Sequence, residues 1–241
     1  MTTSLKYSIF DITYPDSDGL PMAESDAARD YLIYGVEALD RYFQDRPDVY
    51  VSGNLFLYYE QGNPKAVVSP DVFVVLGVEK KKRPSYKVWE EQNKIPDFVL
   101  EVTSKSTASE DRGIKKGLYA YLGIKEYFQY DPTAEYLKPS LQGFRLLEGN
   151  YLSIPGRAEQ DCLVVPSETL GLEVWLEADG AMRFYAPSTG EKLLSPKEMA
   201  QARSAAEQAR SAAEQARYEA EQRANRMAEK LRELGIDPDS L

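Results

Sequence analysis

One short stretch, residues 96–107 with the sequence PDFVLEVTSKST, constrains the fold more than any other part of the chain. Side chains alternate between the two faces of a strand, so one face is apolar throughout. That face holds Phe98, Leu100 and Val102, and the other holds Val99, Glu101 and Thr103. Because both faces are mostly apolar, the pattern predicts a central strand with a packed layer on each side.

This placement puts the Glu101 carboxylate in a protein interior. A buried carboxylate has to be paired with a cation, protonated or bound to a metal ion. A core salt bridge to a lysine or arginine is the structural alternative, and the strand alone does not decide between these states.

Asp71 supplies a second carboxylate. It precedes the apolar run VFVVL, and an antiparallel return that pairs Leu76 with residue 96 or 97 sets Asp71 opposite Glu101 or Val102. Two carboxylates side by side at low dielectric repel each other unless a cation lies between them. Hard oxygen ligands suit Mg²⁺ or Mn²⁺, so these residues form a candidate metal site.

The next segment, 106–123, is predicted to be a helix that ends at Gly123. Asp111, Lys115 and Tyr119 are four residues apart and share one face. The apolar stripe consists of Ile114, Leu118 and Leu122. Lys115 is expected to point back to the acidic pair, where an ammonium group orients water or stabilises charge on a phosphate. The alternative is a surface pair of Asp111 with Lys115.

Two glycines in this helix, Gly113 and Gly117, are costly there and predict a close backbone approach to a strand or a ligand.

The remaining globular sequence alternates between helix and strand patterns. An amphipathic helix is expected between a Ser25 or Asp26 cap and Pro47. A hairpin around Gly62-Asn63-Pro64 follows, and a further strand is expected at 125–132, with two late hairpins at 141–154 and 172–187. The order predicts an α+β domain of three layers (α/β/α-like) around a mixed central sheet.

The composition changes at Pro196, where the sequence becomes rich in alanine, glutamate, glutamine and arginine and repeats the heptad SAAEQAR. Apolar residues are spaced alternately by four and three, with one four-four step after Ala220. This spacing predicts a coiled coil with a stutter, and hence a homo-oligomer. A single solvated helix remains the alternative. The expected domains are 1–195 and 196–241.

Composition excludes several classes of chemistry. The chain has no histidine, which rules out Ser-His-Asp triads, zincins and His-dependent nucleases. The single cysteine, Cys162, cannot form an internal disulfide. Neither a signal peptide nor a membrane span is recognisable, so a cytoplasmic protein without a membrane partner is expected. The net charge of −10 argues mildly against broad nucleic-acid binding.

The run PDFVLEVTSKST, together with DRGIKKGLYAYLGIKEYFQYDP and the upstream SPDVFVV, resembles the Uma2 family (DUF820), of the PD-(D/E)XK nuclease superfamily and frequent in cyanobacteria. The resemblance implies a restriction-endonuclease-like core, with Asp71, Glu101 and the Val102 carbonyl as metal ligands. It implies Mg²⁺ or Mn²⁺ as the cofactor and DNA as the substrate. Lys115 matches the family's helix lysine, whereas Thr103 stands where the superfamily usually has a strand lysine. Tyr119 matches the tyrosine four residues after the helix lysine.

Two functions follow as hypotheses. The first is a metal-dependent DNA endonuclease whose catalytic residues are Asp71, Glu101 and Lys115. The second is a catalytically degenerate DNA-binding or assembly module that keeps the fold and acts through its coiled coil.

Some residues carry weaker hypotheses. The basic segment 80–83 is a candidate contact to DNA backbone, or simply a solvated loop. Base stacking by Tyr119, Tyr127 and Tyr130 is weighed against core packing. Glu24 and Glu37 are candidates for a second shell of carboxylates.

Overall fold

The structure is a computed structural model that describes residues 12–17, 25–103 and 111–234. The chain divides into two compact units, residues 1–193 and 194–241. The predicted hydroxyl caps of the helix that begins near residue 106, and Glu24, lie outside the described residues.

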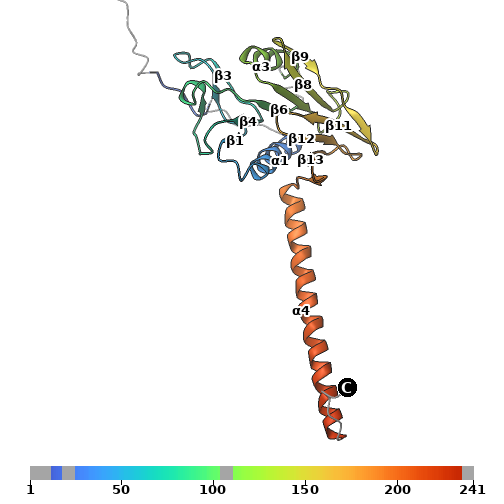
Figure 1. Ribbon diagram of the computed structural model, residues 1–241. Coiled ribbons are helices and arrows are strands. Elements are labelled where there is room, and N and C mark those ends of the chain that lie inside the picture. The colour runs from blue at the N-terminus through green and yellow to red at the C-terminus, as the bar shows by residue number, and fades with distance from the viewer. Residues whose placement is uncertain (1–11, 18–24, 104–110, 235–241) are drawn as a thin grey trace, which may run out of the picture. The chain divides into compact units, whose positions relative to one another are not determined.

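A six-stranded mixed sheet forms the centre of the first unit, in the order β1-β4-β6-β7-β8-β9 (Figure 1). Its strands are β1 (Val49–Ser52), β4 (Val72–Leu76), β6 (Phe98–Val102), β7 (Glu126–Tyr130), β8 (Leu141–Leu147) and β9 (Asn150–Ser153). The strand that contains Glu101 is central, as predicted, with β4 antiparallel on one side and β7 parallel on the other.

The two faces of this sheet belong to two separate hydrophobic clusters. Phe98 and Leu100 pack with helix α1 (Asp26–Tyr42) and with residues of a second sheet. Val99 packs on the opposite face with helix α3 (Lys116–Leu122) and residues of a small third sheet. The predicted alternation of faces in β6 is therefore confirmed.

The two further sheets cover different faces. The second has the order β10-β11-β12-β13-β14, and the third has the order β3-β2-β5. Their strands are β10 (Arg157–Glu159), β11 (Cys162–Ser167), β12 (Leu172–Leu176), β13 (Met182–Ala186), β14 (Glu191–Lys192), β2 (Leu57–Tyr58), β3 (Val67–Val68) and β5 (Tyr86–Lys87), and a 3-10 turn η2 (Val88–Glu90) follows β5.

The predicted hairpin is present, and it keeps one register across two sheets. Val49 pairs with Leu76 in the main sheet, and Leu57 pairs with Val68 in the small sheet. Both pairs are centred on the turn at Gly62 and Asn63, so the outer and inner arms belong to a single interrupted hairpin.

Helix α3 corrects two predictions. It is preceded by a π-helical turn, η3 (Asp111–Lys115), and it ends at Gly123 in the left-handed conformation, as expected. Of the predicted apolar stripe, Leu122 packs against the cluster under α3, whereas Ile114 is 72% exposed and does not join it. The π turn changes the angular spacing on which the stripe was counted. A Cβ added at Gly113 or Gly117 would meet nothing within 4 Å, so neither glycine is there to let a strand approach, and a close approach to a ligand stays a prediction.

The second unit contains one 38-residue helix, α4 (Pro196–Glu233). Ser195 caps it through a capping box with Glu198, and Pro196 occupies the first turn. None of its residues is buried in the single chain. Across the described part of the chain, no helix has both the length and the hydrophobicity needed to span a membrane.

Candidate functional site

A row of polar side chains crosses three neighbouring strands of the main sheet. The β4–β6 register pairs Val72 with Leu100, so its continuation by one residue sets Asp71 opposite Glu101. The β6–β7 register pairs Glu101 with Gln129. Cross-strand neighbours point to the same face of a sheet. Asp71, Glu101 and Gln129 therefore form one row on the face that α3 covers.

Glu101 is completely buried, and each of its carboxylate oxygens has a partner. Lys115 Nζ lies 2.9 Å from Oε2. The Tyr119 hydroxyl donates a hydrogen bond of 2.5 Å to Oε1. The predicted helix face of Lys115 and Tyr119 thus contacts Glu101, and the core ion pair considered from the sequence is formed with Lys115.

The surroundings keep the Tyr119 hydroxyl protonated. Burial raises the pKa of Tyr119 well above its usual value, and the charge of Glu101 and the hydrogen bond to it act in the same direction. Tyr119 is therefore a permanent donor to the carboxylate at neutral pH. It holds Oε1 of Glu101 in place, while the Lys115 ammonium contacts Oε2.

Asp71 is positioned by the ends of two strands. The Val102 backbone N–H donates to Asp71 Oδ2 at 2.7 Å, which fixes the carboxylate at the end of β6. A Cβ on Gly53 would lie 2.2 Å from the Asp71 carbonyl oxygen, so only glycine fits there. Gly53 was not predicted as a site residue, although the Ser-Gly-Asn run at residues 52–54 is a turn signal.

The donor chemistry of this row suits a hard divalent cation. Asp71 and Glu101 offer carboxylate oxygens at the same end of adjacent strands, and carboxylate oxygens are ligands that hard divalent cations prefer. Within residues 25–103 and 111–234, no group of three or more Asp, Glu or Cys side chains is placed to hold a metal. Mg²⁺ is commonly held by one or two carboxylates and keeps several waters, so the two residues fit it.

Three other candidates do not join the site. Tyr127 and Tyr130 are fully buried in the two hydrophobic clusters, so their rings cannot stack on a base. The same holds for the ring of Tyr119, although its hydroxyl contacts Glu101. Glu37 is exposed on α1, where it lines a hollow of about 520 Å³ with Ser52 and the basic segment 80–83.

The basic segment is largely neutralised within the protein. Lys80 contacts Asp40 at 2.9 Å, and Arg83 contacts Glu91 at 2.7 Å. The Arg83 guanidinium also lies 4.2 Å from the centre of the Tyr50 ring. These contacts favour the solvated loop over a dedicated DNA contact.

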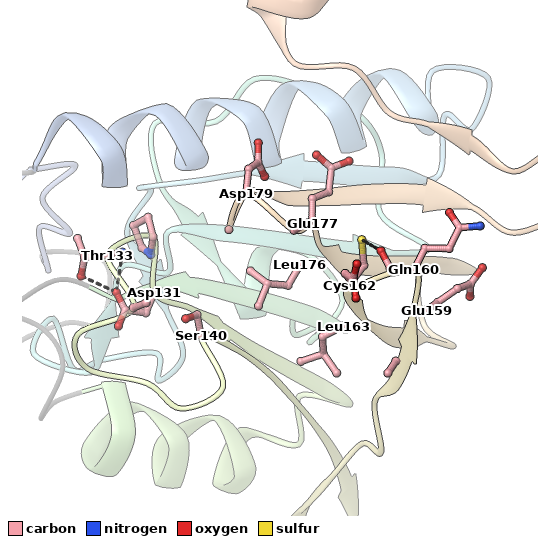
Figure 2. A pocket seen from close by; sticks show the side chains of 16 residues that line it. Asp131, Thr133, Ser140, Glu159, Gln160, Cys162, Leu163, Leu176, Glu177 and Asp179 are labelled. Carbon is pink, nitrogen blue, oxygen red and sulfur yellow. Dashed lines mark hydrogen bonds between the residues drawn. The ribbon is translucent and has the colours of Figure 1, made fainter.

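A second cavity, of about 750 Å³, lies where β7 ends and beside β11 and β12 (Figure 2). The described residues that line it include five acidic side chains and no basic one. Burial alone would raise the pKa of Asp131, but hydrogen bonds from Tyr136, Thr133 and Leu137 lower it below its usual value. Asp131 therefore stabilises its own loop, and the negative lining disfavours a phosphate ligand.

A mixed sheet that carries an acidic pair at the ends of adjacent strands, with a lysine beside it, is typical of the restriction-endonuclease-like class of proteins. The chain belongs to the Uma2 family, described as "Putative restriction endonuclease", whose model matches residues 22–179. The resemblance and the α+β fold with a central mixed sheet are both confirmed.

Among solved structures, the chain is similar to a crystal structure of "a putative nuclease belonging to DUF820" from Anabaena variabilis ATCC 29413. The two are 13% identical, with a TM-score of 0.45, over 62% of this chain and 76% of that one. The comparison with curated proteins gives no significant match.

Proposed function

We propose that this protein is a cytoplasmic, divalent-metal-dependent DNA endonuclease that hydrolyses phosphodiester bonds. The observation that carries the proposal is the placement of Asp71 and Glu101 on adjacent strands, with Lys115 Nζ 2.9 Å from Glu101. Membership of the Uma2 family supports the same reaction class. Mg²⁺ or Mn²⁺ is the proposed cofactor, with Asp71, Glu101 and the Val102 carbonyl as its ligands.

Each residue has a separate role in this reaction. Asp71 and Glu101 bind the cation, which supplies positive charge next to the reacting phosphate when it is bound. The Lys115 ammonium orients the attacking water and stabilises negative charge that develops on the phosphate. Tyr119 holds the Glu101 carboxylate in its orientation by donating a hydrogen bond to it. In the reaction, the water oxygen bonds to phosphorus, the bond from phosphorus to one ester oxygen breaks, and that oxygen leaves as an alcohol with the proton that the water gives up.

The second candidate function is a non-catalytic DNA-binding or assembly module. It is favoured by the engagement of both Glu101 oxygens with Lys115 and Tyr119 and by Thr103 in the place of a strand lysine. We further propose that residues 196–241 form a coiled coil that joins copies of the chain into a homo-oligomer.

Incubation of the protein with supercoiled plasmid, with and without Mg²⁺ or Mn²⁺, tests the endonuclease. Nicked or linear products that require the metal support it. An intact plasmid, combined with retained DNA binding in a gel-shift assay, would support the non-catalytic module. Glu101→Gln serves as the control for a contaminating nuclease, because it changes one atom of a proposed ligand.

A further inference from the structure

Two buried polar atoms beside Glu101 have no hydrogen-bond partner within the part of the chain that the structure describes. They are the Thr103 hydroxyl oxygen and the Gln129 side-chain nitrogen. Each residue is 1% exposed, so bulk solvent does not satisfy either atom. An unsatisfied buried hydroxyl or amide destabilises a folded protein. Two such atoms next to one carboxylate therefore call for a ligand.

Strand geometry brings both residues to the face that carries Glu101. Thr103 follows Glu101 by two residues, so in an extended chain both side chains point to the same face. The Thr103 backbone N–H donates to the Tyr130 carbonyl at 2.7 Å, which continues the pairing with β7 beyond the end of β6. Gln129 is the direct cross-strand neighbour of Glu101. Asp71 lies in the same row on the far side of Glu101, and the next residues along this face, Val99 and Tyr127, are apolar and belong to the cluster under α3. A hydroxyl, an amide and a carboxylate thus meet at the polar end of a hydrophobic face.

The burial of these atoms limits what the ligand is. A nucleotide phosphate cannot reach side chains that are 1% exposed without opening the fold. A single water molecule is small enough to occupy such a site. Buried waters typically make two to four hydrogen bonds to polar groups that are otherwise unsatisfied. The Thr103 hydroxyl accepts or donates, the Gln129 amide donates, and the Glu101 carboxylate accepts.

We propose that Thr103 and Gln129 bind one water molecule against the Glu101 carboxylate and act, through this water, as positioning residues for Glu101. The effect on cleavage rests on the proposed nuclease function. The water site itself does not.

Melting curves of the full chain test the water site without an activity assay. Thr103→Val and Gln129→Met are close in shape to the native residues and remove one contact to the water, so each should lower Tm. Thr103→Ser keeps the hydroxyl and should stay closer to the wild-type Tm. Because the two residues share one water, their effects should not add. The Tm of the double variant should therefore be close to that of the less stable single variant.

An increase in Tm in the single variants, instead of a decrease, would overturn the proposal. If the two atoms have no ligand, replacing either with an apolar group removes a destabilising feature, and both single variants would melt above the wild type with additive shifts. A high-resolution crystal structure is the direct check. It should show one ordered water within hydrogen-bond distance of the Thr103 hydroxyl, the Gln129 amide and Glu101, and a dry site would overturn the proposal.

Plasmid cleavage tests the positioning role. Thr103→Val should lower kcat by about 10-fold to 100-fold, the range for residues that orient a ligand, with KM little changed, and Thr103→Ser should recover most of the loss. Wild-type kcat in Thr103→Val would refute positioning. A wild-type protein that cleaves nothing would instead refute the proposed nuclease, and the melting curves and crystal structure would still decide the water site.

Discussion

Lys115 reaches from a helix to the fully buried Glu101, with 2.9 Å between its Nζ and the carboxylate oxygen, and its own side chain is only 13% exposed. Removing one partner of a buried ion pair destabilises the fold, because the other charge stays buried without compensation. The same contact serves a structural role and, under the proposed function, a catalytic one. Experiments on this pair therefore have to measure stability and cleavage separately.

Lys115→Ala is expected to slow plasmid cleavage by about 10²-fold to 10³-fold, as for the loss of one charged donor in an active site. It is also expected to cost roughly 3–5 kcal/mol of unfolding free energy, because Glu101 stays buried without its cation. Cleavage is measured at a temperature where circular dichroism shows the variant folded. Lys115→Arg keeps the charge and should recover the fold and part of the rate.

Lys116→Met is the matched control for Lys115. Lys116 Nζ lies 3.4 Å from the centre of the Phe144 ring, away from Glu101, and burial lowers the pKa of Lys116. Removing this charge should leave the cleavage rate close to that of the wild type. Equal losses in both variants, or none in either, would mean that Lys115 has no catalytic role.

Glu101→Gln should abolish cleavage and, because it weakens the pair with Lys115, lower the unfolding free energy by about 1–3 kcal/mol. Thermal unfolding with and without Mg²⁺ or Mn²⁺ identifies the ligand role. The metal should raise the Tm of the wild type by mass action and leave that of the variant unchanged. If both proteins shift equally, Glu101 does not bind the metal, and if EDTA leaves wild-type cleavage unaffected, the reaction needs no divalent cation.

The buried Tyr119 predicts a loss of stability at alkaline pH. Its pKa is raised in the folded state, so below about pH 10 both the folded and the unfolded chain carry the proton and Tyr119 adds no pH dependence. Above that pH only the unfolded chain loses the proton, and stability should fall by about 1.4 kcal/mol per pH unit for this residue until the folded-state pKa is passed. Urea unfolding between pH 8 and 11 should show a shallower fall in Tyr119→Phe, and equal slopes would contradict the assignment.

The two kinds of glycine in this fold predict opposite effects of alanine. Gly117→Ala fills open space on an exposed helix and should stabilise the protein by about 0.5–1 kcal/mol, or a few degrees in Tm. Gly53→Ala places a methyl group against the Asp71 carbonyl and should destabilise the protein and reduce cleavage. Differential scanning calorimetry of the pair measures both effects, and a destabilised Gly117→Ala would indicate an unrecognised contact at the helix.

Oligomerisation is tested with the tail. Sedimentation should give a larger mass for the full chain than for a chain that ends at Ser195, because the four-three seam on α4 pairs with a second copy. Ala213→Glu in the seam should dissociate the oligomer, whereas Ser211→Glu on the opposite helix face should not. A monomer mass for each of the four proteins would identify α4 as a single solvated helix.

Strand alternation and an antiparallel return were enough to predict from the sequence that Asp71 lies opposite Glu101 or Val102, and the observed β4–β6 register selects Glu101. Gln129 was missed, since its position depends on the parallel pairing of β7, which local patterns do not encode. Ile114 was misplaced because helical periodicity of 3.6 does not hold through a π turn. Strand β10 was missed because it has three residues, two of them exposed and charged or small, so no apolar pattern marks it. Strand β11 was missed because its short apolar run is followed by Pro166, a residue that is uncommon inside a strand.

The single register of the interrupted hairpin has a consequence for insertions and deletions. Adding one residue to either arm between β1 and β4 is expected to shift the register of that arm and bring a residue with a side chain to the place of Gly53, where a Cβ would lie 2.2 Å from the Asp71 carbonyl oxygen. Length changes are therefore expected to be tolerated only at the tip around Gly62, where a Cβ would meet nothing. Residues can therefore be added at the tip, whereas the length of the two arms has to stay constant to keep Gly53 against Asp71 at the candidate site.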